Sequence, residues 1–362
     1  KPSGVWIMAY TTIDDPSAYF QTALYTGVGG AQDVTNTGNS DLQPDLAWIC
    51  MRNSADNKIW FDSIRGATQR LLSNTSAAEV ALSGNDRMVT AFNSDGLSLG
   101  GNSNATGNNK TFVAWQWKAG TAFSNDASST SIGSIDSAGS VNQDAGFSIC
   151  TFTGTGSAGT MKHGLNTVPK MIIVKGRSEA KAWTVYHSAL GAGKAIFLEQ
   201  NSSLTTSDAY FSGTEPTSSV FGSGSSTNVS GNGITFVAYC FAEKQGYSKM
   251  GGYVGNGNAD GNFIYTGFKP AWVILKGASG SGSNENWSIY DSKRLGYNVD
   301  NNVLDSNTTA AELTDDNIDL LSNGFKIRRA TGLLNDTAVT YIYMAFAENP
   351  FVTSTGIPTT AR

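Results

Sequence analysis

One pattern of glycine, proline, aromatic and threonine positions recurs three times along this chain of 362 residues. Each copy has a Gly-x-Gly turn, a proline before an apolar run, an aromatic residue followed by Asp or His, and a threonine that opens a closing strand. From glycine to threonine the copies span 84, 81 and 85 residues, and from proline to threonine 67, 66 and 70. Matching offsets at independent landmarks predict three homologous units in tandem. Their glycine and threonine ends are Gly27 and Thr111, Gly154 and Thr235, and Gly255 and Thr340.

The copies set the predicted domain boundaries. In chain order we expect a lead-in strand at 1–19, β-sandwich repeats at 20–118, 147–245 and 246–351, a Ser/Ala/Gly-rich linker at 119–146 and a C-terminal tail at 352–362. The linker's composition predicts flexibility, with Ile132 and Ile135 as the positions that would attach it to a neighbouring surface. Because the chain opens on Lys1 rather than on Met, the simplest expectation is a piece of a longer or processed polypeptide.

Composition and local pattern favour strands. A charged fraction of 15% and 41 glycines suit short strands joined by tight turns. The apolar runs at 171–174 and 272–275 indicate central strands covered on both faces. The closing strands at 111–117, 235–241 and 340–346 alternate bulky and small side chains, as in a sheet packed on one side by a second sheet. The predicted fold is all-β: tandem antiparallel β-sandwich domains in three homologous repeats, strung into an extended rod.

Turn and cap signals add local detail. Asp95-Gly96 and Asn323-Gly324 each precede an apolar residue and predict hairpins in the first and third copies. Two capping boxes predict a single helical turn in the same two copies. They are Ser76 with Glu79 and Thr309 with Glu312.

Several function classes are disfavoured. With a net charge of −5 and no basic run between aromatics, we expect no nucleic-acid partner. No apolar run reaches the roughly 20 residues of a membrane span. The three cysteines occupy non-equivalent positions, which predicts buried thiols rather than a disulfide framework. Two histidines in different slots give no metal, cofactor or catalytic set, so we expect no enzyme. Glycoside hydrolysis would need carboxylates such as Asp62, Glu79, Asp291 and Glu312 paired across a cleft.

A polar pair recurs after one strand in two copies. Asp62 and Arg65 in the first copy match Asp291 and Arg294 in the third, whereas the second has His187 in the Asp position. As a candidate ligand site the pair is a polar clamp, with the forked arginine donors reaching a carboxylate or a sugar hydroxyl. The structural alternative is an Asp-capped turn whose arginine is paired locally.

Aromatic residues provide the other candidate ligand site. Trp183 and Trp287 occupy matching positions, where the first copy has Lys58 and places Trp60 two residues on. An accessible indole stacks well on a sugar ring or anchors a protein contact. The alternative is that these side chains fill each sandwich core.

Longer strings resemble a repeated domain of unknown function that is common in the virion proteins of tailed bacteriophages. The resemblance covers about residues 19–351 and implies a virion part without transferable catalytic or binding residues. The strings that carry it are 145–149, 153–156, His163-Gly164-Leu165, 169–175, 246–249, 255–257, 267–272, 321–326 and 341–348.

From this resemblance we expect a bacteriophage virion structural protein located on the particle, in a tail fibre or another surface appendage. Binding to host-surface polysaccharide is a further hypothesis. The expected partners are other virion proteins and other copies of the chain, and a homotrimer is expected by analogy. The alternatives are a capsid decoration or head-fibre protein with a purely structural role and, less favoured, a polysaccharide depolymerase.

Overall fold

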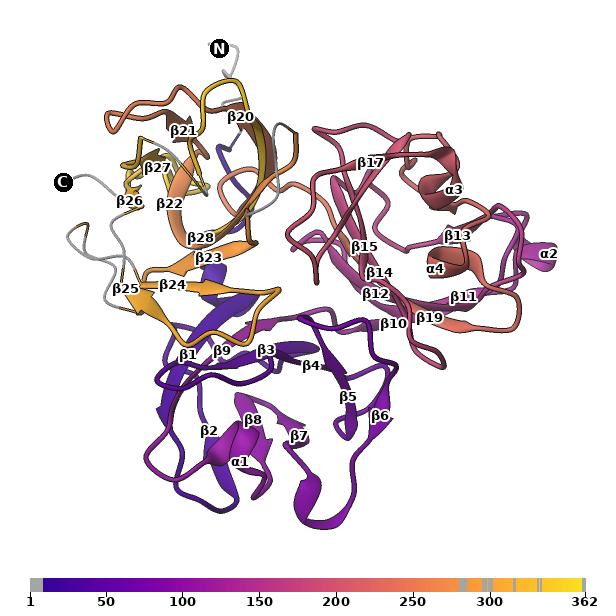
Figure 1. The fold of residues 1–362 in the computed structure, drawn as a ribbon, viewed down its shortest axis with the longest axis horizontal. Helices are drawn as coiled ribbons and strands as arrows, with labels where there is room; N and C mark the ends of the chain where they lie inside the picture. Colours follow the sequence, from indigo (N-terminus) through magenta and orange to yellow (C-terminus); the bar gives the residue numbers. More distant parts are fainter. Residues whose placement is uncertain are drawn as a thin grey trace, which may run out of the picture.

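The computed structural model describes residues 9–279, 285–294, 298, 302–314, 317–330, 332 and 334–359. It is nearly all β, with 43% of residues in strands and 7% in helices, and the strands form several antiparallel sheets. Figure 1 shows three lobes placed around a common centre. The expected rod is therefore not what forms, because each lobe contacts the other two.

We call these lobes the first, second and third units, and each has one large and one small sheet. The large sheets have the orders β1-β9-β3-β4-β5-β6, β10-β11-β12-β19-β14-β15-β16-β17 and β20-β28-β22-β23-β24-β25. The small sheets are β2-β8-β7, β13-β18 and β21-β27-β26. The descent of the units from one repeat stays a prediction. Below, equivalent positions are those that both the sequence match and the strand register align.

The first unit contains β1 (Phe20–Thr26), β2 (Gln32–Val34), β3 (Leu46–Met51), β4 (Ile59–Asp62), β5 (Gln69–Leu72), β6 (Val80–Ala81), β7 (Val89–Asn93), β8 (Gly96–Leu99), α1 (Ser103–Thr106) and β9 (Thr111–Trp117), with 3-10 turns η1 (Pro16–Ala18) and η2 (Gly84–Asp86). The second contains β10 (Thr121–Asn125), α2 (Ala127–Thr130), β11 (Ser137–Asn142), β12 (Phe147–Thr153), β13 (Gly159–Lys162), β14 (Met171–Gly176), β15 (Thr184–His187), β16 (Lys194–Phe197), β17 (Thr205–Thr206), α3 (Asp208–Phe211), β18 (Val220–Ser223), α4 (Thr227–Ser230) and β19 (Thr235–Phe241). The third contains β20 (Ser248–Val254), β21 (Phe263–Tyr265), β22 (Phe268–Gly277), β23 (Ser288–Asp291), β24 (Asn302–Asp305), β25 (Leu313–Thr314), β26 (Ile318–Leu321), β27 (Gly324–Ile327) and β28 (Thr340–Pro350).

The segment expected to be a flexible linker, 119–146, instead adds two strands to the second sheet. β10 pairs with β11, and β11 pairs with β12 along its whole length. Small residues serve close packing here, because a Cβ on Gly139 would overlap the carbonyl of Ile149. Ile135 is buried, as an attachment point should be.

The hairpin signals distinguish the first and third units from the second, as the sequence predicts. The Asp-Gly and Asn-Gly signals close the hairpins β7–β8 and β26–β27. The second unit lacks this signal, and its small sheet has only β13 and β18, with α3 nearby. The two capping boxes start no helix. Glu79 and Glu312 instead lie outside any helix or strand and bond arginines.

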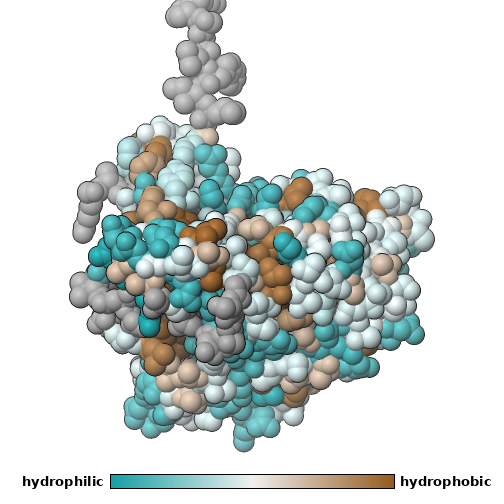
Figure 2. Space-filling model, turned by 45° about the horizontal axis from the view of Figure 1, so that its top comes forward, coloured by the Kyte–Doolittle hydropathy of each residue, from teal (hydrophilic) through white to brown (hydrophobic). Residues whose placement is uncertain are grey.

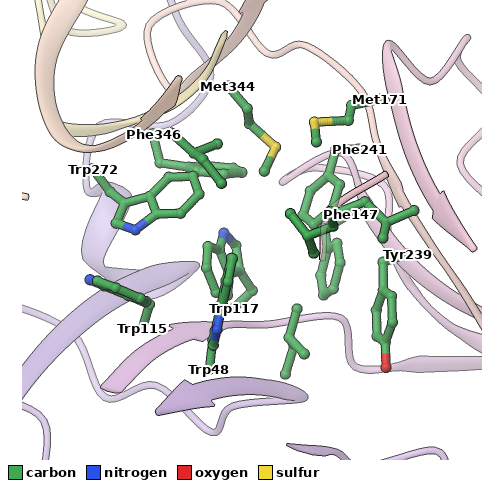
Figure 3. Packing of buried hydrophobic residues seen from close by; sticks show 14 of the residues in the cluster. Trp48, Trp115, Trp117, Phe147, Met171, Tyr239, Phe241, Trp272, Met344 and Phe346 are labelled. Atoms are coloured by element: carbon green, nitrogen blue, oxygen red, sulfur yellow. The ribbon is translucent and has the colours of Figure 1, made fainter. Parts of the chain in front are cut away.

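Apolar side chains form four clusters: one inside each sandwich and one between the three units. The inner clusters join the large and small sheets, as Ile49 and Leu97 do in the first unit. The bulky faces of the closing strands point away from these interiors. They meet in a central cluster rich in Trp and Phe, which Figure 3 shows around Trp117. Each large sheet is therefore buried on both faces, which explains the continuous apolar runs of β14 and β22.

The ends of the chain return to the third unit. Of the predicted lead-in strand at 1–19, residues 1–8 lie outside the described residues, and residues 9–19 form no strand. Within 9–19, the Tyr10 hydroxyl donates to the Gly267 carbonyl at 2.7 Å, and Asp15 caps η1 in the expected turn. In the tail, the Ser354 backbone N–H donates to Asp14 at 2.6 Å. No helix within the described part of the chain has the length and apolar character needed to cross a membrane.

All three cysteines are buried free thiols, as the sequence predicts. Burial raises the pKa of Cys50 and Cys150 to about 12, and it also raises the pKa of Cys240. Because thiolates react and buried thiols do not, we expect no fast reaction of the native protein with Ellman's reagent. All three thiols should react after denaturation. A native thiol that reacts within minutes would contradict the packing described above.

Candidate functional site: the polar contacts between the units

All seven candidate binding residues are buried where the units meet. The exposed fractions are 1% for Trp60, 0% for Trp183, 1% for Trp287, 0% for Asp62, 7% for Arg65, 3% for Asp291 and 0% for Arg294. The indoles belong to the central cluster and not to the sandwich interiors. Other parts of the chain cover these side chains, which favours the structural alternatives, and ligand contact through them stays a prediction.

An ion-pair network joins the first and second units. The Arg65 guanidinium donates to Asp62 from Nε and to Glu79 from one terminal nitrogen at 2.9 Å. Glu79 also accepts two hydrogen bonds from Arg177 of the second unit, at 3.0 and 2.9 Å. The Tyr239 hydroxyl, also from the second unit, donates to Asp62 at 2.6 Å. This network contains both parts of the predicted clamp and links them to the neighbouring unit.

The third and first units repeat this network with equivalent residues. Arg294 donates to Asp291 at 2.6 Å and to Glu312 at 3.0 Å. Glu312 accepts a two-pronged bond from Arg52 of the first unit, with both distances 2.9 Å. The indole Nε1 of Trp115 donates to Asp291 at 2.9 Å, where Tyr239 donates at the other interface.

At the interface between the second and third units, all five equivalent positions differ. His187 replaces the aspartate, and its Nε2 donates to the Tyr343 carbonyl at 3.1 Å. The other four positions are apolar and lie in or against the central cluster. They are Leu190 for the clamp arginine, Leu204 for the glutamate, Ala278 for the partner arginine and Met344 for the donor at the position of Trp115 and Tyr239.

The tryptophan positions tie each unit to the one before it. Trp183 Nε1 donates to the Leu72 carbonyl of the first unit at 2.9 Å. Trp287 Nε1 donates to the Phe197 carbonyl of the second unit at 2.8 Å. Lys58, the equivalent residue of the first unit, donates from Nζ to the Ala310 carbonyl of the third at 2.8 Å. The three contacts close a ring, since the second unit donates to the first, the third to the second and the first to the third.

A second set of equivalent residues meets where the three units converge. The Ser73 hydroxyl donates to the Ser306 carbonyl at 3.0 Å. The Ser306 hydroxyl donates to the Leu198 carbonyl at 3.4 Å. All three residues are fully buried. Contact among equivalent residues from three units is the geometry of a threefold arrangement within a single chain.

At the two ionic interfaces, pairing with arginines lowers the pKa of the glutamates. Burial alone would raise the pKa of Glu79, but the hydrogen bond from Arg177 and the charge of Arg65 outweigh it and lower this pKa. For the same reasons the pKa of Glu312 is lowered by its bonds to Arg52 and Arg294. Burial lowers the pKa of His187 to about 4, so this imidazole stays neutral at neutral pH. These groups hold fixed charges or none, which suits a structural contact.

The four carboxylates that glycoside hydrolysis would need are paired with arginines. Asp62 and Glu79 bind the same guanidinium, as Asp291 and Glu312 do, so neither pair faces an open cleft. Among the described residues, no group of three or more His, Cys, Asp or Glu side chains is placed to hold a metal ion.

Six network members are not among the predicted binding residues, although the sequence singles out Glu79 and Glu312 as helix caps and as carboxylates that hydrolysis would need. One signal in the sequence could have placed four of the six in the network. The second copy replaces Asp, Arg and Glu together, which marks these residues as one set. Arg52 and Arg177 follow from the same comparison, because Ala278 is their equivalent. The missed residues are Glu79, Glu312, Arg52, Arg177, Tyr239 and Trp115.

The hollows at the surface of the described part of the chain include two that border the large sheets. One, of about 810 Å³, is on the second unit beside β11 and β12, and Ser, Thr, Asn and Asp residues dominate its lining. The other, of about 290 Å³, lies between β1 and the third unit, with Thr22, Ala271 and Lys293 in its walls.

The apolar interface supplies a template for testing the ionic one. Replacing Arg65 by Leu leaves the buried Asp62 carboxylate without its cationic partner and leaves Glu79 with Arg177 alone, and we expect a loss of about 3–5 kcal/mol in unfolding free energy. Adding Asp62→His, Glu79→Leu, Arg177→Ala and Tyr239→Met should recover more than half of that loss. Urea unfolding followed by tryptophan fluorescence measures both.

The matched control is Arg328→Leu, which breaks the half-exposed pair with Asp319. A loss of no more than about 1 kcal/mol is expected there. If the five-residue variant is no more stable than Arg65→Leu alone, the two kinds of interface are not interchangeable and this interpretation is wrong.

His187 should make stability depend on pH. Its pKa is about 4 in the folded chain and 6.5 as the ordinary value. As the pH falls from 6.5 to 4, the unfolded chain takes up a proton that the folded chain refuses, so stability falls by up to about 3 kcal/mol. His187→Gln should remove this part of the pH dependence while keeping a donor for Tyr343.

Unfolding midpoints of the wild type and of His187→Gln between pH 4 and 7 test this. His163, whose pKa is also lowered to about 4 by burial, remains in the variant and keeps a residual slope. Parallel curves for the two proteins over this range would show that His187 contributes nothing.

Comparison with known proteins gives a family for the chain but no activity. Residues 15–350 match the family model described as a domain of unknown function, DUF7483. Neither the curated proteins nor the solved structures contain a match. Since the matched region covers most of its length, the chain belongs to the DUF7483 family of domains.

Proposed function

We propose that this chain is a structural protein of a bacteriophage virion, a component of a tail fibre or another surface appendage. The observation that carries the proposal is how the candidate binding residues are used. Charged and indole side chains that suited a ligand site are instead buried, and they hold three units around one core. The sequence resemblance to phage virion proteins supplies the setting.

The surface agrees with a building block. On the face shown in Figure 2, apolar residues form small groups between polar ones. A chain fixed at three interfaces also keeps its outer surfaces in constant relative positions, which suits repeated contacts with other virion proteins. A glycan contact through Trp60, Trp183 or Trp287 is not part of the proposal. The expected homotrimer stays a prediction.

The proposal predicts that the chain is a fixed part of purified particles. Virions of the encoding phage should contain it in a constant copy number by quantitative mass spectrometry. An antibody against the chain should label the tail or its appendages in negative-stain electron micrographs. Labelling of the head would instead support the decoration or head-fibre alternative.

Particles from a phage that lacks the gene are the control for antibody specificity. If the chain is abundant in infected cells but absent from purified particles, it is not a virion protein.

A further inference from the structure

The first and second sheets differ at one edge. In the second sheet, β12 pairs with β11 on its outer side, in the register Ser140 with Ile149. The equivalent strand of the first sheet is β1, since Thr22 and Ile149 pair with the equivalent residues Trp115 and Tyr239. Among the described strands, β1 ends the first sheet. Within the described strands, the position that β11 occupies beside β12 therefore has no counterpart beside β1.

The backbone of β1 presents a regular set of groups at this edge. The Lys118 N–H donates to the Tyr19 carbonyl at 3.0 Å, and the Gly27 N–H donates to the Lys110 carbonyl at 2.8 Å. In an antiparallel pair, hydrogen-bonded residues alternate with residues whose backbone groups point to the other side. Phe20, Thr22 and Leu24 therefore turn their N–H and C=O groups towards the open edge.

A side chain at the same edge also lacks a partner. Thr22 is 9% exposed, and its hydroxyl has no hydrogen-bond partner in the described part of the chain. Buried hydroxyls are nearly always satisfied. In the second sheet the residue opposite the Thr22 position is Ser140. A serine there would face Thr22 on an added strand, and Thr–Ser pairs across strands bond through their hydroxyls.

This edge borders a hollow at its start and is exposed at Leu24. The hollow of about 290 Å³ runs beside Phe20 and Thr22, and Leu24 further along is 41% exposed. The third sheet is different at its equivalent strand, β20. There the Met250 N–H donates to the Glu243 carboxylate, and the Ser248 N–H donates to the Lys244 carbonyl.

We propose that the edge of β1 binds an extended segment of another polypeptide, which adds to the first sheet as an antiparallel strand. The occupant has the chemistry of β11: small Ser, Ala and Gly side chains, with a hydroxyl opposite Thr22. Small side chains are required because β11 lies close to its neighbour at Gly139. Backbone pairing supplies the affinity and the small side chains the selectivity, as in other strand additions. The proposal depends on this edge alone and holds whatever the role of the whole protein.

A synthetic peptide copying residues 121–142, the β10–β11 hairpin, is the probe. The full 362-residue chain should bind the labelled peptide saturably at one site in fluorescence polarisation. Hydrogen exchange should slow at the amides of Thr22 and Leu24. The matched control peptide is N-methylated at the Ala138 and Ser140 positions, which face β12 in the parent hairpin. It should bind at least about tenfold more weakly, because two backbone donors are lost.

Two variants of the chain locate the site. Thr22→Pro removes a donor that β9 does not use, and it should weaken binding about tenfold or more. Thr22→Val removes only the hydroxyl, and a smaller loss of about fivefold is expected. If Thr22→Pro proves unstable by its melting curve, the N-methylated peptide still tests the pairing.

Three results would overturn the proposal. The first is that no saturable binding is observed. The second is equal binding of the methylated and unmethylated peptides. The third is slowed hydrogen exchange confined to β12, because the peptide would then replace the chain's own hairpin beside β12 instead of binding at β1. Self-association that Thr22→Pro abolishes, without peptide binding, would assign the edge to a second copy and also refute the stated occupant.

Discussion

The two-faced burial of the large sheets is the constraint on which the rest of the structure depends. One face of each sheet closes a small sandwich interior, and the other carries Trp, Phe, Tyr and Met side chains into the shared cluster. A buried aromatic side chain removes about 150–250 Å² from water, worth roughly 4–6 kcal/mol at 25 cal/mol per Å². A unit on its own would expose that face, which is far more apolar surface than a soluble domain normally carries. The three units therefore stabilise one another, and the ring arrangement follows from covering three such faces at once.

Apolar contact alone does not fix how the units are turned against one another, and the polar contacts supply that restriction. Directional bonds from Trp183, Trp287 and Lys58 to backbone carbonyls fix each unit against its predecessor. Inside the cluster, the indole N–H groups of Trp48, Trp60, Trp117 and Trp272 have no hydrogen-bond partner in the described part of the chain. Ring geometry offers partial compensation, since Trp117 and Trp272 lie edge to face at 5.4 Å. An N–H directed at a neighbouring ring recovers part of a lost hydrogen bond.

Local sequence signals predicted local features, such as hairpins and the side chains that share a strand face, but not what packs against them. Asp95-Gly96 specified a hairpin because those two residues tolerate the required backbone, and alternation specified which side chains of 235–241 share a face. Alternation carries no information about what covers a face, so the bulky side was assigned to the sandwich interior instead of the shared centre. The same limit explains the tryptophans: Trp183 is buried by Leu72 and Thr75, more than 100 residues earlier. Glu79 fits a helix cap locally, but two arginines from different units bind it more strongly than backbone amides would.

Between the described residues of the second and third units there is no ion pair, and the comparison among equivalent positions gives the reason. Removing any single member of a buried network leaves the others unpaired, so stepwise loss is unfavourable, whereas complete replacement by packed apolar groups is nearly neutral. The second–third interface has this complete form, with Leu190, Leu204, Ala278 and Met344 together. Its fifth member, His187, avoids an isolated charge because it is neutral and bonds a main-chain carbonyl that no substitution can remove. The polar residues of each ionic interface therefore act together, and their contributions to stability are not additive. The described contacts of these polar residues join neighbouring units.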